Sequence, residues 1–501
     1  MNRKKKFIYS SGASIIKQIV GLICGMILPR LILVHYGTQV NGLVSSIGQF
    51  LSLIGIFDAG MGVVIEASLF APLAVRDNAR ISAVLASGKK FYNRIVQILL
   101  IYVLILSVSY PKFVSGKFDY FYVLLLVLAI SVSYFGQYYF GVVNSVLLTA
   151  DQRGYIYYNV YTFTTILNTI VCIIMMKMNA PIHLMKLGSS IVFFLRPLIL
   201  AIYVKKNYNI NWKQEYNEEP IKQKWNGFAQ HIATLVVGNT DVVVLTLFST
   251  LENVSIYSVY YLVVNGLKEM LNSSMAGIKS IFGDMYVRNE KKKLVDTFSL
   301  VEAIIHFCTT YIFGIAAILI VPFVSVYTRG VYDANYNVPI FGFIICLAFC
   351  VYCLRMPYNS LLMSIGHFKE TQTSSIIEAI INIVISIITV SKLGLIGVAI
   401  GTFAAVLYRF VYLAYYTNKV ILKRTNFYTT KLIIIDILLI TCVLYILQNI
   451  GLNEYNYYAW IKIGLRATIL TFPFLLIAIL VGNPNIFRLG KQYFTTRSKN
   501  K

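Results

Sequence analysis

Residues 205–227, KKNYNINWKQEYNEEPIKQKWNG, divide the chain into two apolar parts. Charged and amide residues alternate in this stretch with no apolar period, and no other polar stretch of the sequence is as long. Apolar runs of helix length lie on both sides of it. We interpret 205–226 as a cytosolic linker between two bundles of membrane-spanning helices.

The composition indicates a membrane protein. The 501 residues are 58% hydrophobic and only 13% charged, whereas a soluble domain is about 25% charged. One soluble core stops growing at about 250–300 residues, so lipid is the better place for this much apolar surface. The net charge of +24 lies mostly in short loops, so it predicts topology and no nucleic-acid partner. All seven cysteines fall inside apolar runs, which argues against disulfides and a zinc site.

Fourteen apolar runs are long enough to cross a bilayer, which takes about 20 residues. They are continuous rather than alternating, so we expect helices and not a barrel of strands. The fold class expected is therefore an all-α integral membrane protein with about 14 transmembrane helices. The runs lie near 11–35, 41–66, 92–111, 120–148, 156–177, 182–204, 227–248, 254–282, 297–325, 338–364, 373–391, 394–416, 431–450 and 460–481.

Basic residues predict the orientation of these spans, because cytosolic loops carry an excess of Lys and Arg. One set of loops is rich in them, at 3–6, 76–90, 205–224, 288–293, 419–424 and 488–501. The opposite set carries little beyond Lys112, Lys117, Lys177, Arg329 and Lys392. We expect a multi-pass membrane protein with both termini in the cytosol.

The two halves repeat in sequence. NSVLL at 144–148 matches NSLLM at 359–363, an offset of 359 − 144 = 215. A second set keeps an offset of 401 − 188 = 213, and it pairs Gly188, Arg196, Tyr203 and Lys206 with Gly401, Arg409, Tyr416 and Lys419. An even number of spans per half predicts parallel repeats. We expect a six-helix lobe at 1–204, the linker at 205–226, a second lobe at 227–416 related to the first by pseudo-two-fold symmetry, and two extra spans with a cytosolic tail at 417–501.

Motifs for enzymatic chemistry are missing from the sequence. It has no phosphate-binding loop, no dinucleotide-binding glycine pattern and no HExxH motif, and its five histidines are scattered. We therefore expect neither an enzyme nor a bound cofactor. Charges inside the spans remain, and such residues are costly in lipid and often functional. The basic ones are Lys17, Arg30, Arg196, Lys268, Arg355 and Arg409, and the acidic ones are Asp58, Asp241, Glu269, Glu378 and Asp436.

Each of these charges has a structural alternative to a role in binding. Arg196 and Arg409 lie within about two turns of the expected cytosolic surface, so they either contact a cargo or extend to lipid headgroups. Lys17 and Asp58 lie at similar depth on adjacent spans. Asp241 and Lys268 both lie near the middle of theirs, and either couple is also compatible with a structural ion pair.

Several stretches resemble the polysaccharide-transport flippases. They are LPRLILVHYGTQVNGL at 28–43, LIGIFDAGMG at 53–62, GNTDVVVLTLF at 238–248 and VSIYSVYYL at 254–262. These flippases belong to the multidrug/oligosaccharidyl-lipid/polysaccharide (MOP) exporter superfamily. The resemblance implies two six-helix lobes around a central cavity, alternating access, and a cargo of undecaprenyl-pyrophosphate-linked oligosaccharide for O-antigen, capsule or exopolysaccharide synthesis. It also implies contact with membrane lipids and leaves H⁺ or Na⁺ as the coupling ion.

Carried onto this chain, the resemblance makes charged residues of the first, second, seventh and eighth spans the cavity candidates. These are Lys17, Arg30, Asp58, Asp241, Lys268 and Glu269; Arg196, Arg355 and Arg409 are added from the charge pattern. The two extra spans resemble the lipid II flippase branch, but the first span has only Arg30 and Lys17 in place of that branch's arginine cluster, which argues against lipid II. The alternatives are a drug or cation antiporter of the same superfamily and a membrane polysaccharide polymerase.

The charge asymmetry of the loops predicts which positions an impermeant thiol reagent reaches in intact cells. In a cysteine-free background, Asn335→Cys should be labelled and Asn217→Cys should be shielded until the membrane is permeabilised, because basic loops stay in the cytosol. Labelling in the reverse order would contradict the orientation.

Overall fold

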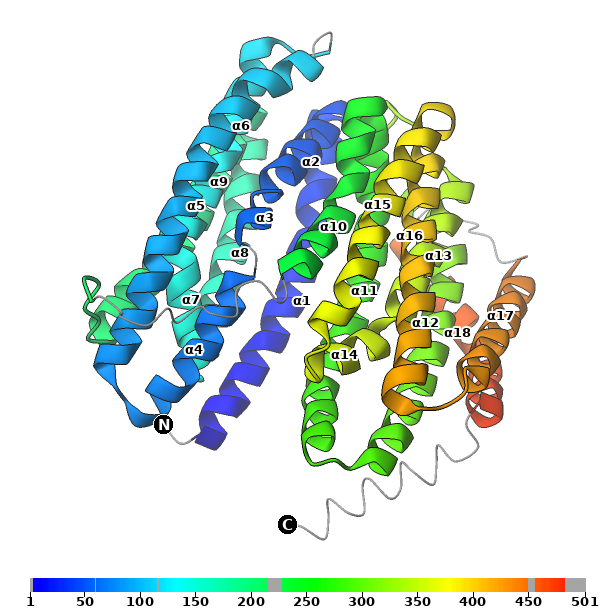
Figure 1. Cartoon of the computed structure of the whole chain (residues 1–501). Helices are drawn as coiled ribbons and strands as arrows, with labels where there is room; N and C mark the ends of the chain where they lie inside the picture. The colour runs from blue at the N-terminus through cyan, green and yellow to red at the C-terminus, as the bar shows by residue number, and fades with distance from the viewer. Residues whose placement is uncertain (1–2, 59, 115–116, 215–227, 449–455, 483–501) are drawn as a thin grey trace. The chain divides into compact units, whose positions relative to one another are not determined.

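The computed structural model describes residues 3–58, 60–114, 117–214, 228–448 and 456–482, and all regular structure in these ranges is helical (Figure 1). Contacts between Cα atoms divide the chain into two compact units, Met1–Val243 (unit 1) and Val244–Lys501 (unit 2). Most of the polar linker, 215–227, lies outside the described residues, so the division into lobes at 205–226 stays a prediction.

Unit 1 contains the first nine α-helices, one π-helical segment and most of a tenth helix. They are α1 (Arg3–Tyr36), α2 (Thr38–Ser52), α3 (Gly55–Asp58), α4 (Met61–Val75), α5 (Asn78–Phe113), α6 (Tyr120–Gly136), η1 (Gln137–Gly141), α7 (Val142–Ala150), α8 (Gly154–Lys177), α9 (Ile182–Asn207) and α10 (Phe228–Phe248). Within this unit α8 packs against both α1 and α9, and α6 packs against α9 and α5.

Unit 2 contains the remaining helices. They are α11 (Leu251–Val287), α12 (Lys291–Tyr327), α13 (Pro339–Leu354), α14 (Met356–Ser364), α15 (Phe368–Leu393), α16 (Leu395–Tyr416), η2 (Thr417–Leu422), α17 (Phe427–Leu447) and α18 (Tyr457–Gly482). The closest packing joins α15 to α16, α13 to α16, and α12 to α13, while α17 and α18 both lie against α12.

Thirteen segments of the described residues are long and apolar enough to cross a membrane. The fourteenth expected span, 254–282, is present as a helix, because it lies within the 37 continuous residues of α11. Charged and amide residues, among them Asn265, Lys268 and Glu269, make α11 more polar than the others. The chain is thus an all-helical membrane protein, as the sequence predicts.

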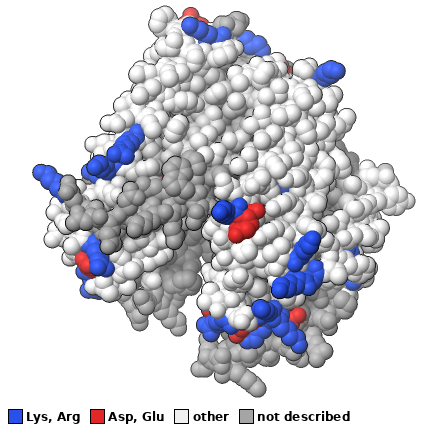
Figure 2. All heavy atoms as spheres, viewed as in Figure 1, with Lys and Arg blue, Asp and Glu red and all other residues white. Residues whose placement is uncertain are grey.

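Lipid explains the side chains that face outward. In α5, Ile101, Leu104 and Ile105 are each 60% exposed or more, whereas Leu99 and Val103 of the same helix are buried. A helix that is apolar all round belongs in a membrane. On the face drawn in Figure 2, charged side chains are sparse over the middle of the surface and gather mainly near its ends.

Three of the expected spans are interrupted in the structure. The second span breaks between α3 and α4 at Gly60, whose φ of 72° favours glycine. The tenth breaks at Arg355, and Pro357, the second residue of α14, has no N–H group to donate to the preceding turn. The fourth contains the π-helical turn η1. Irregular backbone at membrane depth is tolerated where protein or a wet cavity surrounds it, and two charged candidates, Asp58 and Arg355, lie at these breaks.

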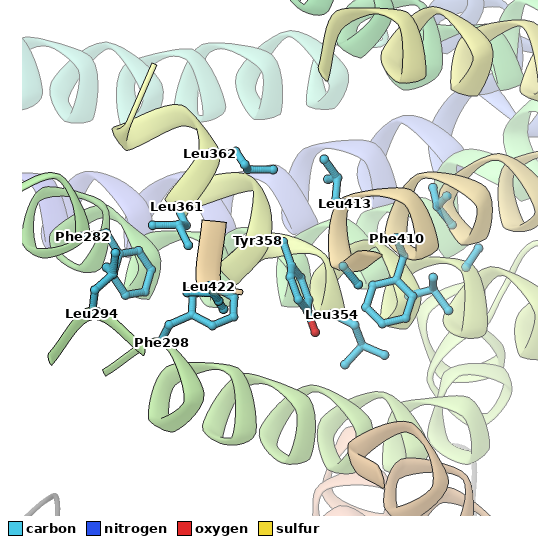
Figure 3. Packing of buried hydrophobic residues seen from close by; sticks show 14 residues of the cluster. Phe282, Leu294, Phe298, Leu354, Tyr358, Leu361, Leu362, Phe410, Leu413 and Leu422 are labelled. Carbon is cyan, nitrogen blue, oxygen red and sulfur yellow. The ribbon is translucent and has the colours of Figure 1, made fainter. Parts of the chain in front are cut away.

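A core of aromatic and leucine side chains holds α11, α12, α14 and α16 of unit 2 together. Phe282, Phe298 and Tyr358 are fully buried, and the ring of Phe298 lies 5.7 Å from that of Phe282 and 5.5 Å from that of Tyr358. Figure 3 shows Tyr358 and Phe410 pointing into the same cluster. Tyr358 therefore belongs both to this core and, through its hydroxyl group, to a polar network described below.

Small residues allow α15 and α16 to approach closely. Gly397 and Gly401 form a GxxxG pattern, which is typical of close helix pairs in membranes. A Cβ atom at Gly401 would lie 2.8 Å from the backbone N of Ser386, and one at Gly397 would lie 2.6 Å from the backbone of Thr389. Since backbone cannot move aside as a side chain can, only glycine fits at these two positions.

We predict that Gly401→Ala lowers the free energy of unfolding by about 1–3 kcal/mol, the usual cost of overpacking, measured by chemical denaturation in detergent. The control is Gly25→Ala in α1, where a Cβ meets no atom within 4 Å. Alanine should leave that helix as stable or more stable. Equal effects of the two substitutions would contradict the packing argument.

Candidate functional site

In unit 1, two cations share the ring of Tyr161. The Lys17 Nζ lies 4.5 Å from the ring centroid, and the Arg196 Cζ lies 3.9 Å from it. Lys17 also lies over Tyr157 and Tyr158. None of the ion pairs formed between described residues involves Lys17 or Arg196. Tyrosine faces attract cations, but they do not cancel the charge. This cation pair, Lys17–Arg196, therefore has a formal charge of +2 that no ion pair with a described carboxylate offsets.

Asp58 is held apart from Lys17. Its Oδ1 accepts a hydrogen bond of 2.6 Å from the Tyr92 hydroxyl, and the Tyr92 ring lies 6.3 Å from that of Tyr138 in η1. The structure thus gives Lys17 and Asp58 different partners, and the ion pair considered from the sequence does not form. Asp58 instead lies at the helix break beside Gly60.

Arg30 and Asp241 are the other two candidates of unit 1. Arg30 lies in α1 and is partly exposed, whereas Asp241 lies in α10 and is only 5% exposed. Both take part in interactions. Because Asp241 belongs to unit 1 and Lys268 to unit 2, a contact between them stays a prediction.

In unit 2, a lysine and an arginine again share one tyrosine ring. The Lys268 Nζ lies 5.6 Å from the centroid of Tyr352, and the Arg355 Cζ lies 4.0 Å from it. Lys268 forms an ion pair of 3.1 Å with Glu269, whose side chain is 57% exposed. This exposed partner is free to exchange with water or with a stronger anion. Lys268, Glu269, Tyr352 and Arg355 thus lie in one group.

Arg355 and Arg409 are joined by one carboxylate. Arg355 Nη1 donates to Glu378 Oε1, and Arg409 Nε lies 3.7 Å from Glu378 Oε2. The Arg409 side chain is only 3% exposed, so it does not extend to lipid headgroups. The unit 2 group, Lys268–Glu269–Arg355–Glu378–Arg409, holds three cations and two carboxylates, a net charge of +3 − 2 = +1.

Arg196 and Arg409, which occupy matching positions of the sequence repeat, have similar partners. Arg196 Nε donates to the Thr164 hydroxyl at 3.0 Å, a residue of the preceding helix α8. Arg409 Nη1 donates to the hydroxyl of Ser374 and to the carbonyl oxygen of Thr371 at 2.8 Å, both in the preceding helix α15. The difference is the carboxylate, because Glu378 lies beside Arg409, whereas no described carboxylate forms an ion pair with Arg196.

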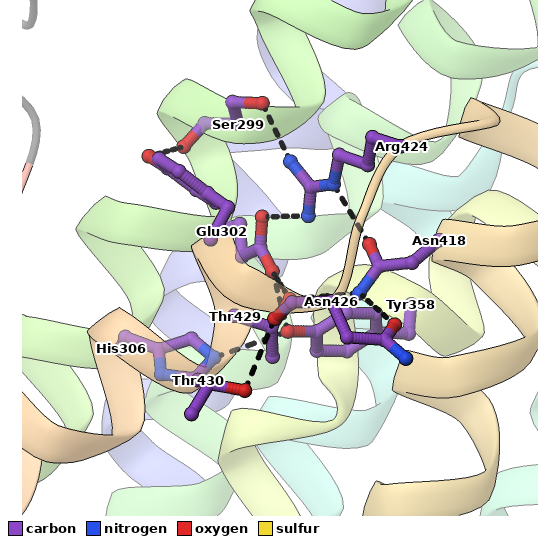
Figure 4. A network of polar contacts seen from close by, with 10 residues as sticks. Ser299, Glu302, His306, Tyr358, Asn418, Arg424, Asn426, Thr429 and Thr430 are labelled. Atoms are coloured by element: carbon purple, nitrogen blue, oxygen red, sulfur yellow. Dashed lines mark hydrogen bonds and ion pairs between the residues drawn. The ribbon is translucent and has the colours of Figure 1, made fainter.

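A second buried network in unit 2 was not expected from the sequence. Arg424 donates to Glu302 Oε2, to the Asn418 side-chain oxygen at 2.7 Å and to the Ser299 hydroxyl at 2.7 Å. Thr429 also donates to Glu302, at 2.8 Å. Figure 4 shows these groups converging from α12, the η2–α17 connection and α17. The signal that could have indicated it is the spacing of Glu302 and His306, four residues apart on one helix face.

The network extends deeper through His306. Its Nδ1 lies 2.6 Å from Asp436 Oδ2, and its Nε2 lies 3.3 Å from the Tyr358 hydroxyl. Tyr358 donates to Glu302 at 2.6 Å, and Thr310 donates to Asp436 at 2.9 Å. The sequence predicts only a packed or interfacial histidine, and His306 is packed, being fully buried.

A polar cavity lies at the end of unit 2 opposite its basic loops. It measures about 730 Å³ and is lined by Arg329, Tyr332, Asn335, Asn337 and Asn456 among others. The connection between α12 and α13 supplies most of this lining. Its backbone is held from inside, where the Tyr260 hydroxyl donates to the Tyr336 carbonyl at 2.9 Å.

At the basic-loop end of unit 1, Tyr208 donates to Asp151 at 2.6 Å, and Arg153 pairs with the same carboxylate at 2.8 Å. Burial, and then this hydrogen bond, raise the pKa of Tyr208. Burial alone would lower the pKa of Arg153, but Tyr208 and Asp151 raise it above its usual value. The hydrogen bond and the ion pair fasten the end of α9 to the connection between α7 and α8.

No group of three or more His, Cys, Asp or Glu side chains that could hold a metal ion occurs in the ranges that the structure describes. The clusters above are instead mixtures of cations, carboxylates and tyrosines. Such sites suit anions, protons or hydrogen-bonding solutes better than a coordinated transition metal.

Solved structures of membrane transporters share this fold. The lipid II flippase MurJ in its inward closed conformation matches with a TM-score of 0.70 and 14% identity, over 93% of this chain and 98% of that one. An inward-facing multidrug resistance MATE family transporter of the MOP superfamily matches with a TM-score of 0.65 and 12% identity, over 80% and 95%. A MATE in complex with MaL6 matches at 0.53 and 15%, over 85% and 98%. No family model and no curated protein sequence matches the chain.

The fold is therefore similar to that of these transporters, which confirms the all-α fold class expected from the sequence. The identities, all below 25%, carry no information on the cargo.

We predict that Glu378→Gln destabilises unit 2 strongly, because it leaves Arg355 and Arg409 without their shared carboxylate. Removing one partner of a buried ion pair costs about 3–5 kcal/mol. The matched control, Glu269→Gln, removes an exposed partner and should cost less than about 1 kcal/mol. Denaturation of the two purified variants in the same detergent gives the comparison, and similar losses for both would show that Glu378 has no special role.

Proposed function

We propose that this chain is a flippase that moves undecaprenyl-pyrophosphate-linked oligosaccharides from the inner to the outer leaflet of the bacterial cytoplasmic membrane. The observation that carries the proposal is the Lys17–Arg196 pair, in which two cations share the Tyr161 ring and form no ion pair with a described carboxylate. Two like charges repel one another strongly in a medium of low polarity, and a bound anion would offset this repulsion. A pyrophosphate group supplies that anion.

The group in unit 2 supports the same cargo. Its net charge is +1, and the carboxylate nearest to Lys268 is the exposed Glu269. A pyrophosphate can displace Glu269 from Lys268 at little cost, since an exposed ion pair contributes only about 0–1 kcal/mol. Arg355 is better held by the buried Glu378. Each unit thus offers a lysine with an arginine and a tyrosine beside it, at Lys17 in unit 1 and at Lys268 in unit 2.

The last two helices are matched more fully by the lipid II flippase than by the inward-facing MATE transporter. Residues 417–501 make up 501 − 416 = 85 residues, or 17% of the chain. A match that covers 93% of the chain, as the lipid II flippase does, must include part of them. A match that covers 80%, as the MATE transporter does, need not. The fold of the flippase thus accounts for more of this chain.

The alternative function is a drug or cation antiporter. An antiporter would favour acidic residues such as Asp58 for its cations, but the basic intramembrane candidates at least equal the acidic ones in number. Lipid II itself is less suited to this chain than other lipid-linked oligosaccharides, because α1 carries only Lys17 and Arg30 as intramembrane cations. The polar cavity lined by Tyr332 and several asparagines provides hydrogen-bonding groups suitable for sugar hydroxyls.

The transport test uses proteoliposomes that contain the purified full-length protein and undecaprenyl-pyrophosphate-linked N-acetylglucosamine. Lys17→Gln and Arg196→Gln should each lower the rate of flipping at least about tenfold, since a hydrogen bond to a charged group contributes ~1.5–3 kcal/mol. Lys462→Gln, on the exposed face of α18, makes the same change of charge and should leave the rate unchanged.

Arg196→Lys separates two roles of the guanidinium group. Lysine keeps the charge but loses the two-pronged contact with a phosphate. If the lysine variant flips the probe as fast as the unmodified protein, Arg196 acts only as a charge. If the unmodified protein does not move the probe but moves a lipophilic cation, the flippase proposal is wrong and the antiporter alternative stands.

A further inference from the structure

The buried network around His306 carries a charge imbalance. Among the described residues, three charged groups act on His306: Asp436 from α17, Glu302 from α12, and Arg424 from the connection that leads into α17. Two carboxylates and one guanidinium sum to −2 + 1 = −1. The side chains of Glu302 and His306 are 0% exposed and that of Asp436 is 8% exposed. An uncompensated charge in such surroundings costs several kcal/mol, so neutrality requires one additional proton.

The directions of the hydrogen bonds place that proton on the imidazole. Asp436 Oδ2 lies 2.6 Å from Nδ1, and an ionised carboxylate can only accept. The Tyr358 oxygen faces Nε2, and because its own hydrogen is donated to Glu302, this oxygen is an acceptor as well. A neutral imidazole has one N–H group, whereas the imidazolium cation has two. With Asp436 ionised, only the cation donates to both acceptors, and we place the additional proton on the imidazole rather than on the carboxyl group.

The remaining neighbours do not offer another site. Phe410 of α16 lies with its ring 5.9 Å from the His306 ring and carries no proton to exchange. From α13, the Cys350 thiol acts on Asp436 and Thr310 rather than on the imidazole. Thr310 and Thr429 donate to the two carboxylates. Arg424 stays protonated at all relevant pH values. Among the basic groups of the described network, only the His306 imidazole can gain or lose a proton.

The network also offers a route. Arg424 lies at the end of unit 2 that carries the basic loops, and its side chain is 14% exposed, more than any other ionised member. From there, successive contacts join Glu302, Tyr358, His306 and Asp436. Chains of carboxylates, histidines and hydroxyls of this kind conduct protons inside membrane proteins.

We propose that His306 is a proton-binding site, at which one exchangeable proton enters from the Arg424 end and forms an imidazolium between Asp436 and Tyr358. The binding itself does not depend on what is transported. Its consequence rests on the proposed function: the proton is the coupling ion of the flippase, taken up and released as α17 shifts against α12.

Nuclear magnetic resonance of the full-length protein, labelled with ¹⁵N-histidine and reconstituted in nanodiscs, tests the binding. The chain has five histidines, and the His306 signal is the one that disappears in His306→Gln. We expect an imidazolium signal at pH 7, lost on alkaline titration and converted to a neutral imidazole in Asp436→Asn. The exposed-histidine control, His35→Gln, should leave the imidazolium signal in place. A His306 that stays neutral at pH 7 overturns the proposal, whichever carboxyl group holds the proton.

The melting temperatures of two variants give a second test, which remains informative even if His306→Gln folds poorly. His306→Gln alone leaves the network with a charge of −1, whereas His306→Gln combined with Asp436→Asn leaves only the balanced Glu302–Arg424 pair. The melting temperature should fall in the single variant and recover in the double variant. If the double variant melts no higher than the single one, the charge-balance argument is wrong.

Coupling is measured in proteoliposomes that hold a trapped pH indicator and undecaprenyl-pyrophosphate-linked N-acetylglucosamine. The unmodified protein should move protons as it flips the probe. The double variant should flip the probe down its gradient without moving protons. Flipping without proton movement in the unmodified protein overturns the coupling, while absence of flipping refutes the proposed function and leaves the resonance result to decide proton binding.

Discussion

Charge compensation in a medium without water is the constraint on which this structure depends. Each ion that lies between helices has lost its hydration, and it stays there only if other groups replace the water. Unit 2 meets this requirement with shared carboxylates. Glu378 pairs with two arginines. Glu302 accepts hydrogen bonds from three donors, one of which is Arg424. The interruptions of the helices place these groups, because Arg355 lies where α13 gives way to α14.

Two sites have incomplete charge compensation, and the sign of the excess charge suggests the kind of ligand that each site suits. The Lys17–Arg196 pair has aromatic faces but no described carboxylate as a partner, and it suits an anion. The His306 network has one carboxylate too many and suits a proton. These two sites have opposite imbalances and lie in different units of the chain. A transporter that exchanges an anionic cargo against protons has a use for both.

The sequence predicts the helices well, because the energetic gain of burying 20 apolar residues in lipid outweighs local propensity. It also indicates most of the charged candidates, since an ion such as Arg409 stands out in an apolar run. It could not supply their partners. Glu302 escaped the list of intramembrane charges although it lies within the ninth expected span, and Arg424 falls in a loop by composition. Their contact joins residues 122 positions apart, and pairing over such distances depends on tertiary packing, which no local pattern encodes.

The central claim is that the chain binds a lipid pyrophosphate rather than a lipophilic cation. Thermal melting of the purified full-length protein, with and without undecaprenyl pyrophosphate, tests it most directly, because a ligand that binds only the folded state raises the melting temperature. We predict a rise with undecaprenyl pyrophosphate, a smaller rise with undecaprenyl monophosphate and none with tetraphenylphosphonium. Stabilisation by tetraphenylphosphonium with no effect of the pyrophosphate lipid would contradict the account.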